Sequence, residues 1–342
     1  MLYLDAARCL ETPRPPIWIM RQAGRYMPVY LALRDRYGFM EMIHNPELAA
    51  TVTMQPIDAF GPDAAILFSD ILVVAEALGQ TLTFVEKKGP VLMPPLLSTT
   101  GTSVLRDPED ALSRLAYVPQ AIRLIRERLP RETALIGFSG APFTVGCYMI
   151  EGGSSPDLKA TKQMMVTDPD TFRQIIERVT VVTIGYLKSQ VDAGVHALQL
   201  FDTWAGLLSW EDFQIWILPF VSRIIAELKT YGPKVPMTYF CKGMGGFYPL
   251  ALDMAPDVLG CDWQSDIVGI KKNIGTRPIA VQGNLDPMLL YAPLAVLRER
   301  ANRLIASLRP YPGHIFNLGH GILPDMNPAH VKVLVDTVKA WK

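Results

Sequence analysis

The stretch Ala134-Leu135-Ile136-Gly137-Phe138, residues 134–138, is apolar throughout and bounded by polar residues. A continuous apolar run of this length is typical of a strand buried on both faces of a parallel sheet. Further runs of the same kind recur along the chain, at residues 17–20, 64–68, 197–201, 236–240, 258–261, 279–282 and 314–318. The sequence therefore predicts eight strands of a parallel sheet.

Helical segments lie between these runs. Good capping residues stand directly before a proline at Asn45-Pro46, Asp107-Pro108, Asp168-Pro169, Asp286-Pro287 and Asn327-Pro328, and Ser209 with Asp212 fits a capping box. Strands alternating with helices predict an α/β fold, and the count of eight favours a (β/α)8 (TIM-type) barrel over a doubly wound open sheet. We expect one somewhat distorted barrel over residues 1–342, with extra helices and loops at its C-terminal face.

Composition excludes several classes of function. Of the 342 residues 49% are hydrophobic, so the chain can bury a large core, and 33 basic residues balance 33 acidic ones. This balance gives no indication of a nucleic-acid partner. No signal peptide and no run of about 18 apolar residues is found, so we expect a cytoplasmic protein without a membrane span. Cysteines 9, 147, 241 and 261 stand far apart, which predicts reduced, mostly buried thiols and no metal site.

The ends of the predicted strands carry the candidate chemistry. In barrels of this kind the active site lies at the C-terminal ends of the strands. The residues found there include Arg21, Asp70, Thr203 and His320. Polar groups at such positions predict a concave polar site, but they do not name a reaction.

Two motifs are more specific. Residues 20–28 read Met-Arg-Gln-Ala-Gly-Arg-Tyr-Met-Pro, and Arg34 follows. Clustered guanidinium groups suit a substrate with many carboxylates, although surface arginines paired with glutamates are the alternative. Asp70 lies between two apolar runs, where a carboxylate is costly unless it is paired or serves a ligand. An ion pair with Arg21 or Arg25 is therefore the alternative to a catalytic role for Asp70.

These motifs, together with residues 68–74, 137–144, 148–153 and 317–321, resemble the uroporphyrinogen decarboxylase family, in the family's order and over nearly the whole chain. The resemblance implies a single distorted barrel that acts as a homodimer with neither metal nor organic cofactor. It also implies the reaction: removal of the carboxyl groups from the acetate side chains of uroporphyrinogen III, which yields coproporphyrinogen III and carbon dioxide.

The resemblance further implies roles for individual residues. Asp70 would face the pyrrole N–H groups and stabilise the cation formed when a pyrrole carbon is protonated. Arg21 would supply that proton, with solvent as the alternative because a guanidinium is a poor acid. Substrate contacts are expected from Arg21, Gln22, Arg25, Arg34, Phe138, Tyr148, Thr203 and His320.

The residues alone leave other interpretations open. Phe138 fits a core position, Tyr148 a barrel wall, and His320 a loop cap before the helix at Asn327. Thr203 stands where some relatives have serine, and either hydroxyl donates and accepts. Two rival functions remain: a cobalamin-linked methyltransferase, whose His-x-Cys zinc ligands are missing here, and a non-catalytic tetrapyrrole-binding protein.

Overall fold

The computed structural model describes residues 1–85, 89–97, 102–232 and 234–341. Seven parallel strands form one curled sheet in the order β1-β4-β5-β6-β7-β8-β9. Each strand coincides with one of the predicted runs, and their bounds are β1 (Ala64–Ile66), β4 (Ala134–Gly140), β5 (Ala197–Asp202), β6 (Met237–Cys241), β7 (Val258–Gly260), β8 (Ala280–Leu285) and β9 (His314–Leu318). The prediction of a parallel sheet inside an α/β fold is confirmed.

The expected first strand, residues 17–20, is not a regular strand. In the described residues its ladder pairing with the sheet is one bridge, from Ile17 to Phe316 on β9. Phe316 N donates to Pro16 O at 2.8 Å, and Asp63 N donates to Ile17 O at 2.7 Å, so the segment runs between β9 and the start of β1. Beyond this bridge Asn317 Oδ1 accepts from Met20 N at 3.0 Å and from Leu318 N at 2.7 Å, so the two backbone donors that would extend the ladder bond to a side chain instead. The expectation of eight regular strands is therefore corrected to seven strands and one bridging segment.

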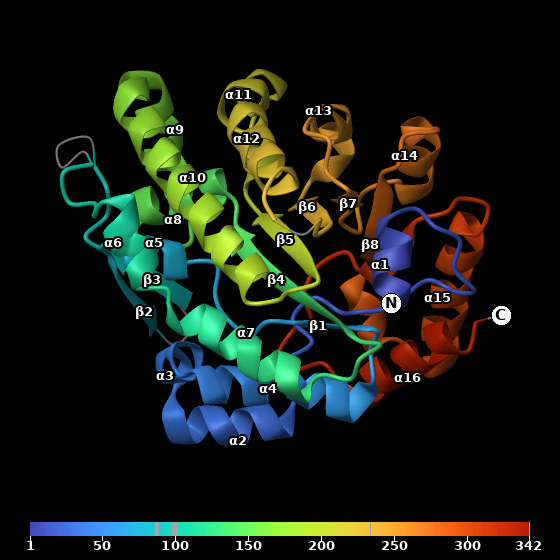
Figure 1. The fold of residues 1–342 in the computed structure, drawn as a ribbon. Coiled ribbons are helices and arrows are strands. Elements are labelled where there is room, and N and C mark those ends of the chain that lie inside the picture. The colour runs from blue at the N-terminus through green and yellow to red at the C-terminus, as the bar shows by residue number, and fades with distance from the viewer. Residues whose placement is uncertain (86–88, 98–101, 233, 342) are drawn as a thin grey trace.

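Helices cover the outer side of the sheet, with α10 and α12 beside β4 and β5, and α16 beside α4 and α15 (Figure 1). A small hairpin of β2 (Thr81–Val85) and β3 (Gly89–Met93) lies apart from the main sheet. The α-helices are α1 (Leu2–Ala7), α2 (Pro28–Tyr37), α3 (Phe39–His44), α4 (Pro46–Phe60), α5 (Val73–Ala77), α6 (Pro108–Ser113), α7 (Tyr117–Arg128), α8 (Pro142–Glu151), α9 (Lys159–Thr167), α10 (Pro169–Asp192), α11 (Trp210–Trp216), α12 (Leu218–Lys229), α13 (Tyr248–Asp253), α14 (Ile267–Ile274), α15 (Leu294–Leu308) and α16 (Pro328–Lys339). Short 3₁₀ helices are η1 (Ala205–Leu207), η2 (Met244–Gly246) and η3 (Pro287–Tyr291).

The predicted helix starts are mostly confirmed. Asn45, Asp168 and Asn327 accept backbone N–H groups of the first turns of α4, α10 and α16, as the capping rule requires. Asp286 caps the 3₁₀ helix η3 rather than an α-helix. Asp107 occupies the cap position of α6, but its side chain accepts no capping bond. Ser209 Oγ accepts from Asp212 N at 3.1 Å and so caps α11.

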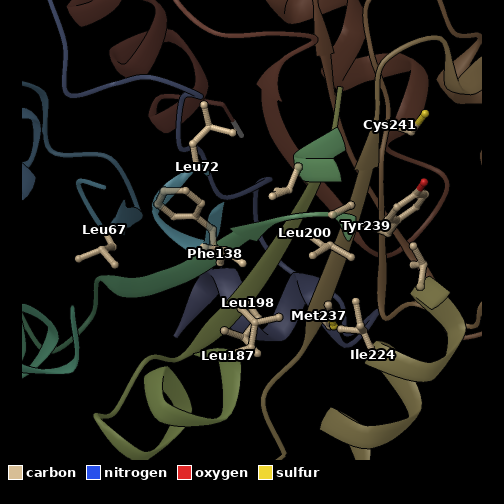
Figure 2. Packing of buried hydrophobic residues seen from close by; sticks show 14 of the residues in the cluster. Leu67, Leu72, Phe138, Leu187, Leu198, Leu200, Ile224, Met237, Tyr239 and Cys241 are labelled. Carbon is tan, nitrogen blue, oxygen red and sulfur yellow. The ribbon is translucent and has the colours of Figure 1, made fainter. Parts of the chain in front are cut away.

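The sheet is buried on both faces. On the outer face, Leu198 and Met237 pack against Leu187 of α10 and Ile224 of α12 (Figure 2). The inner face holds a second cluster with small residues such as Ala64 and, from α1, the side chain of Tyr3. Because strand side chains alternate in direction, the same strands that anchor the helices also present residues to the inside of the curl. This alternation positions the site described below.

The structure also describes the cysteines and the apolar character of the helices. Cys147, Cys241 and Cys261 are buried and Cys9 is partly buried, all as free thiols. Across the described ranges, no helix has the length and apolar character needed to cross a membrane.

Candidate active site

Asp70 lies just beyond the C-terminal end of β1. Its Oδ1 accepts the backbone N–H of Leu72 at 2.8 Å, which turns the chain into α5. Burial raises the pKa of Asp70 to about 6, although the Leu72 hydrogen bond and the charge of Arg21 act in the opposite direction. In the described part of the chain, no basic side chain lies within 4.0 Å of this carboxylate. The alternative of an Asp70 ion pair with Arg21 or Arg25 therefore does not describe the structure.

Arg21 occupies a tight turn that directs its side chain toward the same region. Its φ of 64° lies in the left-handed region, which costs a non-glycine residue roughly 1–2 kcal/mol. Gln22 N donates to Ile19 O at 2.8 Å and closes the turn. The Arg21 side chain passes directly over Gly321, where a Cβ atom would overlap it. This close approach explains the glycine that follows His320 in the sequence.

The surroundings of Arg21 disfavour its charged form. Burial is the main cause and lowers its pKa, Arg25 adds to the effect, and Asp70 and Tyr148 oppose it. Arg21 as a whole residue is nevertheless exposed to solvent. The direction of this shift is the one that a proton donor needs.

The buried side chain of Gln22 connects the Arg21 turn to the start of β1. The side chain is 1% exposed. Its Oε1 accepts from Ile19 N at 3.1 Å, and its Nε2 donates to Ala64 O at 3.1 Å. These bonds tie the Arg21 turn to the start of β1, and a direct contact between Gln22 and substrate stays a prediction.

Tyr148, on α8, borders the same space. Its ring stacks on Trp204 with centroids 3.9 Å apart. Burial raises the pKa of Tyr148, the Ser154 hydroxyl lowers it, and the charges of Asp70 and Arg21 act on it in opposite directions. Tyr148 therefore lies within electrostatic range of both predicted catalytic groups.

The residue before Thr203 holds this side of the site in place. Asp202 is fully buried and accepts hydrogen bonds from Thr144 Oγ1 at 2.5 Å and Tyr239 OH at 3.0 Å. Thr144 Oγ1 in turn accepts from Trp204 N at 3.2 Å, which fixes the ring that stacks on Tyr148. Thr203 itself is half-buried, and its hydroxyl has no hydrogen bond to another described residue.

His320 follows β9 and contacts aromatic rings rather than a helix end. Its ring centroid lies 6.3 Å from Phe240 and 6.1 Å from Trp263. Burial lowers its pKa to about 4, and the charges of Arg21 and Lys242 add to this. The imidazole is therefore neutral near pH 7. His320 makes no hydrogen bond to another described residue, so the alternative that it caps the loop before the helix at Asn327 has no bond to support it.

Aromatic residues form the base of the site. Phe138 of β4 makes an edge contact with Phe201 at 5.6 Å, and Phe201 makes one with Phe240 at 6.0 Å. Sequence reasoning proposed Phe138 and missed the other two. The signal was available, because alternation from Ala197 through Gln199 directs Phe201 inward.

Basic groups surround the site without acidic partners. Arg25 is exposed and Arg34 half-buried, and both charges act on the phenol of Tyr30 between them. Lys242 follows a predicted strand and was assigned no role from the sequence; its Nζ lies 5.8 Å from the Trp263 ring centre. The side chains of Arg21, Arg25 and Arg34 form no ion pair within the described ranges. Arg21 lies within electrostatic range of Arg25, Asp70, Tyr148 and His320, whereas Arg34 is related to this group only through Tyr30, on which Arg25 also acts.

No group of three or more His, Cys, Asp or Glu side chains that could hold a metal occurs among the residues with described positions. A surface hollow lined by Arg14, Tyr311 and His314 lies at the N-terminal ends of the strands and contains none of the predicted site residues.

The fold and site together define an α/β enzyme whose polar site lies at the C-terminal ends of a curled parallel sheet. The model of the family described as "Uroporphyrinogen decarboxylase (URO-D)" matches residues 1–341. The chain belongs to this family, as the sequence motifs indicated.

Similar proteins agree with this assignment. The chain is 45% identical to a uroporphyrinogen decarboxylase of Trichlorobacter lovleyi, with 98% of this chain and 97% of the relative covered. It is 44% identical to one of a Roseiflexus species, with 99% and 98% covered. Among solved structures, a methyltransferase from Methanosarcina mazei has a TM-score of 0.81 at 20% identity, with 98% and 96% covered. That likeness shows the fold alone.

Proposed function

We propose that this chain removes the carboxyl groups from the four acetate side chains of uroporphyrinogen III and releases coproporphyrinogen III and carbon dioxide. The observation that carries the proposal is the isolated Asp70 carboxylate amid arginines that lack acidic partners. An octacarboxylate needs many cations at the rim of its site, and a pyrrole cation needs one anion near its centre. The full-length relatives of the same name support the substrate.

The proposed chemistry depends on an electron sink. A pyrrole acetate loses carbon dioxide readily once a ring carbon is protonated, because the ring then accepts the electrons of the breaking C–C bond. A second proton then replaces carbon dioxide on the side chain, and the ring carbon loses the first. The net consumption is one proton for each acetate.

Asp70 would stabilise the intermediate cation. At about 4 Å and an effective dielectric of about 20, such a pair is worth up to about 4 kcal/mol. That energy corresponds to roughly three powers of ten in rate. The aromatic base formed by Phe138, Phe201 and Phe240 would exclude water and keep the dielectric low.

Arg21 is the first candidate for the proton donor, since its surroundings favour the neutral form more than those of an ordinary arginine do. Tyr148, Thr203 and a neutral His320 would supply the polar wall around the macrocycle. Gln22 would act chiefly by holding the Arg21 turn.

The test is an incubation of the purified chain with uroporphyrinogen III under reducing conditions, with products separated by carboxyl number. We expect species with seven, six, five and four carboxyl groups to follow one another. Unchanged octacarboxylate that stays bound would instead identify a tetrapyrrole-binding protein. Methyl transfer from a corrinoid, with no carbon dioxide released, would identify the methyltransferase alternative.

We further propose that the segment at Ile17 closes the sheet into a barrel of one domain, supported by its hydrogen bonds to β9 on one side and to Asp63 on the other. A homodimer in the cytoplasm is proposed from the family resemblance. Exposed apolar side chains on η1 and α11, at Leu207, Trp210 and Ile215, offer one surface for a second copy. Light scattering of the purified chain would give twice the monomer mass, and a monomer at micromolar concentration would contradict the proposal.

A further inference from the structure

Four buried hydroxyl groups in the region of Asp70 have no hydrogen-bond partner among the described residues. They are Ser69 Oγ, Tyr117 OH, Thr183 Oγ1 and Tyr186 OH, and each oxygen is buried. An unsatisfied buried polar group costs about 1–3 kcal/mol, so native proteins rarely gather several of them in one place. A gathered set of this kind is the usual sign of buried water.

The four hydroxyls come from the loop between β1 and α5 and from helices α7 and α10, and α10 packs against both α5 and α7. Ser69 is the neighbour of Asp70, while Thr183 and Tyr186 are three residues apart on α10 and so share one helix face. Burial raises the pKa of Tyr186 and the Ser69 hydroxyl lowers it, so the two hydroxyls lie close together, although their geometry falls short of a regular hydrogen bond. One water molecule beside the pair, in contact with both oxygens, would complete their hydrogen bonding.

Tyr117, at the start of α7, extends this cluster toward the surface. Its ring makes an edge contact with the ring of His44 at 5.0 Å. His44 Nε2 lies 2.9 Å from Glu76 Oε2, and these two side chains are 38% and 28% exposed. The Tyr117 hydroxyl lies within electrostatic range of Tyr186, Glu76 and Asp70. The series therefore begins at solvent with His44 and Glu76 and ends at Asp70.

The proposed reaction requires a supply of protons to the site. Each conversion of R–CH₂–COO⁻ and H⁺ into R–CH₃ and CO₂ consumes one proton, so one uroporphyrinogen consumes four. A macrocycle bound over the strand ends covers the open side of Asp70. Replacement protons must then reach the site by another route.

We propose that Ser69, Thr183, Tyr186 and Tyr117 hold buried water and form a proton path from the Glu76–His44 pair to Asp70. This inference rests on the proposed function and specifies the route of the solvent-derived proton. A proton taken up at the pair moves by transfer between hydroxyls and water, and each group gives up one proton as it receives another. After carbon dioxide has left, Asp70 accepts the last proton and passes it to the side-chain carbon that lost the carboxyl group. The ring carbon returns its proton to Arg21, and Asp70 is again the carboxylate that faces the next cation.

The four hydroxyl residues are positioning residues in this scheme, because none of them touches the substrate. Other charged groups near the path are few. Arg21 and Tyr148 face Asp70 from the substrate side, and Arg106 donates to the main-chain carbonyl of Glu76 at 3.4 Å.

The test compares Tyr186→Phe and Tyr117→Phe with Tyr3→Phe as a matched control. Tyr3 OH is also buried without a hydrogen-bond partner, but α1 carries it against β8 and β9, away from Asp70. Turnover of uroporphyrinogen, KM, the solvent deuterium isotope effect and the pH profile would be measured for each. We expect the two path variants to lose about tenfold in kcat with unchanged KM and a larger isotope effect, and the control to match the wild type.

Glu76→Gln provides a second test at the outer end, since it should move the acidic limb of the kcat profile without changing KM. Wild-type turnover is measured first, so failure of the proposed function would be seen separately. Path variants that match Tyr3→Phe in rate and isotope effect would overturn the proposal. So would slow path variants with an unchanged isotope effect and pH profile, which would indicate a merely structural role.

The water itself offers a readout independent of activity. A crystal structure of the substrate-free protein at high resolution should contain ordered water bridging Ser69, Thr183 and Tyr186. A dry cluster would overturn the proposal even if the variants were slow.

Discussion

Asp70→Asn separates a catalytic carboxylate from a structural one by two measurements. Burial raises the pKa of Asp70 from 3.8 to about 6. Each pKa unit corresponds to about 1.4 kcal/mol, so at a pH above 6 the ionised side chain lowers the free energy of unfolding by about 3 kcal/mol. Because the pKa is raised on folding, this loss develops as pH rises from about 4 to about 6 and is absent at lower pH.

Asparagine keeps the shape of the side chain and can still accept the Leu72 N–H, but it carries no charge. We therefore expect Asp70→Asn to be more stable than the wild type by about 1–3 kcal/mol at pH 8, and the difference to vanish near pH 4. The same substitution removes the charge that stabilises the pyrrole cation, so kcat should fall by about two to three powers of ten.

Urea unfolding at pH 8 and pH 4 gives the first quantity, and decarboxylation with saturating uroporphyrinogen gives the second. The reasoning is refuted by a variant that unfolds earlier at pH 8 and retains near-normal turnover. That result would mean that the carboxylate is paired in solution and serves the fold.

Four further predictions concern the rim, the turn, the pH profile and cofactors. Arg25→Ala should raise KM at least tenfold with little change in kcat, whereas Arg36→Ala, whose guanidinium stacks on Tyr37, should leave steady-state kinetics unchanged; equal behaviour of the two would place Arg25 outside the site. Gly321→Ala should displace Arg21 and lower kcat at least tenfold with the melting temperature nearly unchanged, so normal turnover would contradict the proposed donor. The rate at saturating substrate should depend on a group with a pKa of about 6, and a profile flat from pH 5 to 8 would exclude Asp70. Protein dialysed against a strong chelator should retain full activity, and recovery of lost activity on addition of zinc or a pyridoxal compound would contradict a cofactor-free mechanism.

Seven of the eight strands could be predicted because apolar runs between helix caps leave few other interpretations. The eighth run, 17–20, was equally apolar, but its pairing depends on backbone donors. The Asn317 side chain accepts the Met20 and Leu318 N–H groups that a longer ladder would use, and the chain turns into the left-handed conformation at Arg21. Hydrophobicity alone does not report either constraint.

Only part of the candidate site could be predicted, because sequence motifs locate residues but do not give their contacts in space. Motifs located Arg21 and Asp70, but the absence of an ion pair between them depends on distances across two loops. The roles of Gly321 and Asp202 depend on contacts between segments far apart in the chain. Lys242 stands at the end of a predicted strand but was assigned no role, because an exposed lysine at such a position is common on protein surfaces.

The most direct test of the account is a structure of this chain with coproporphyrinogen bound. The account predicts that an Asp70 carboxylate oxygen lies about 3 Å from a pyrrole nitrogen, with the arginine rim on the side-chain carboxylates. A macrocycle bound away from the C-terminal ends of the strands, or one whose pyrrole nitrogens do not face Asp70, would contradict it.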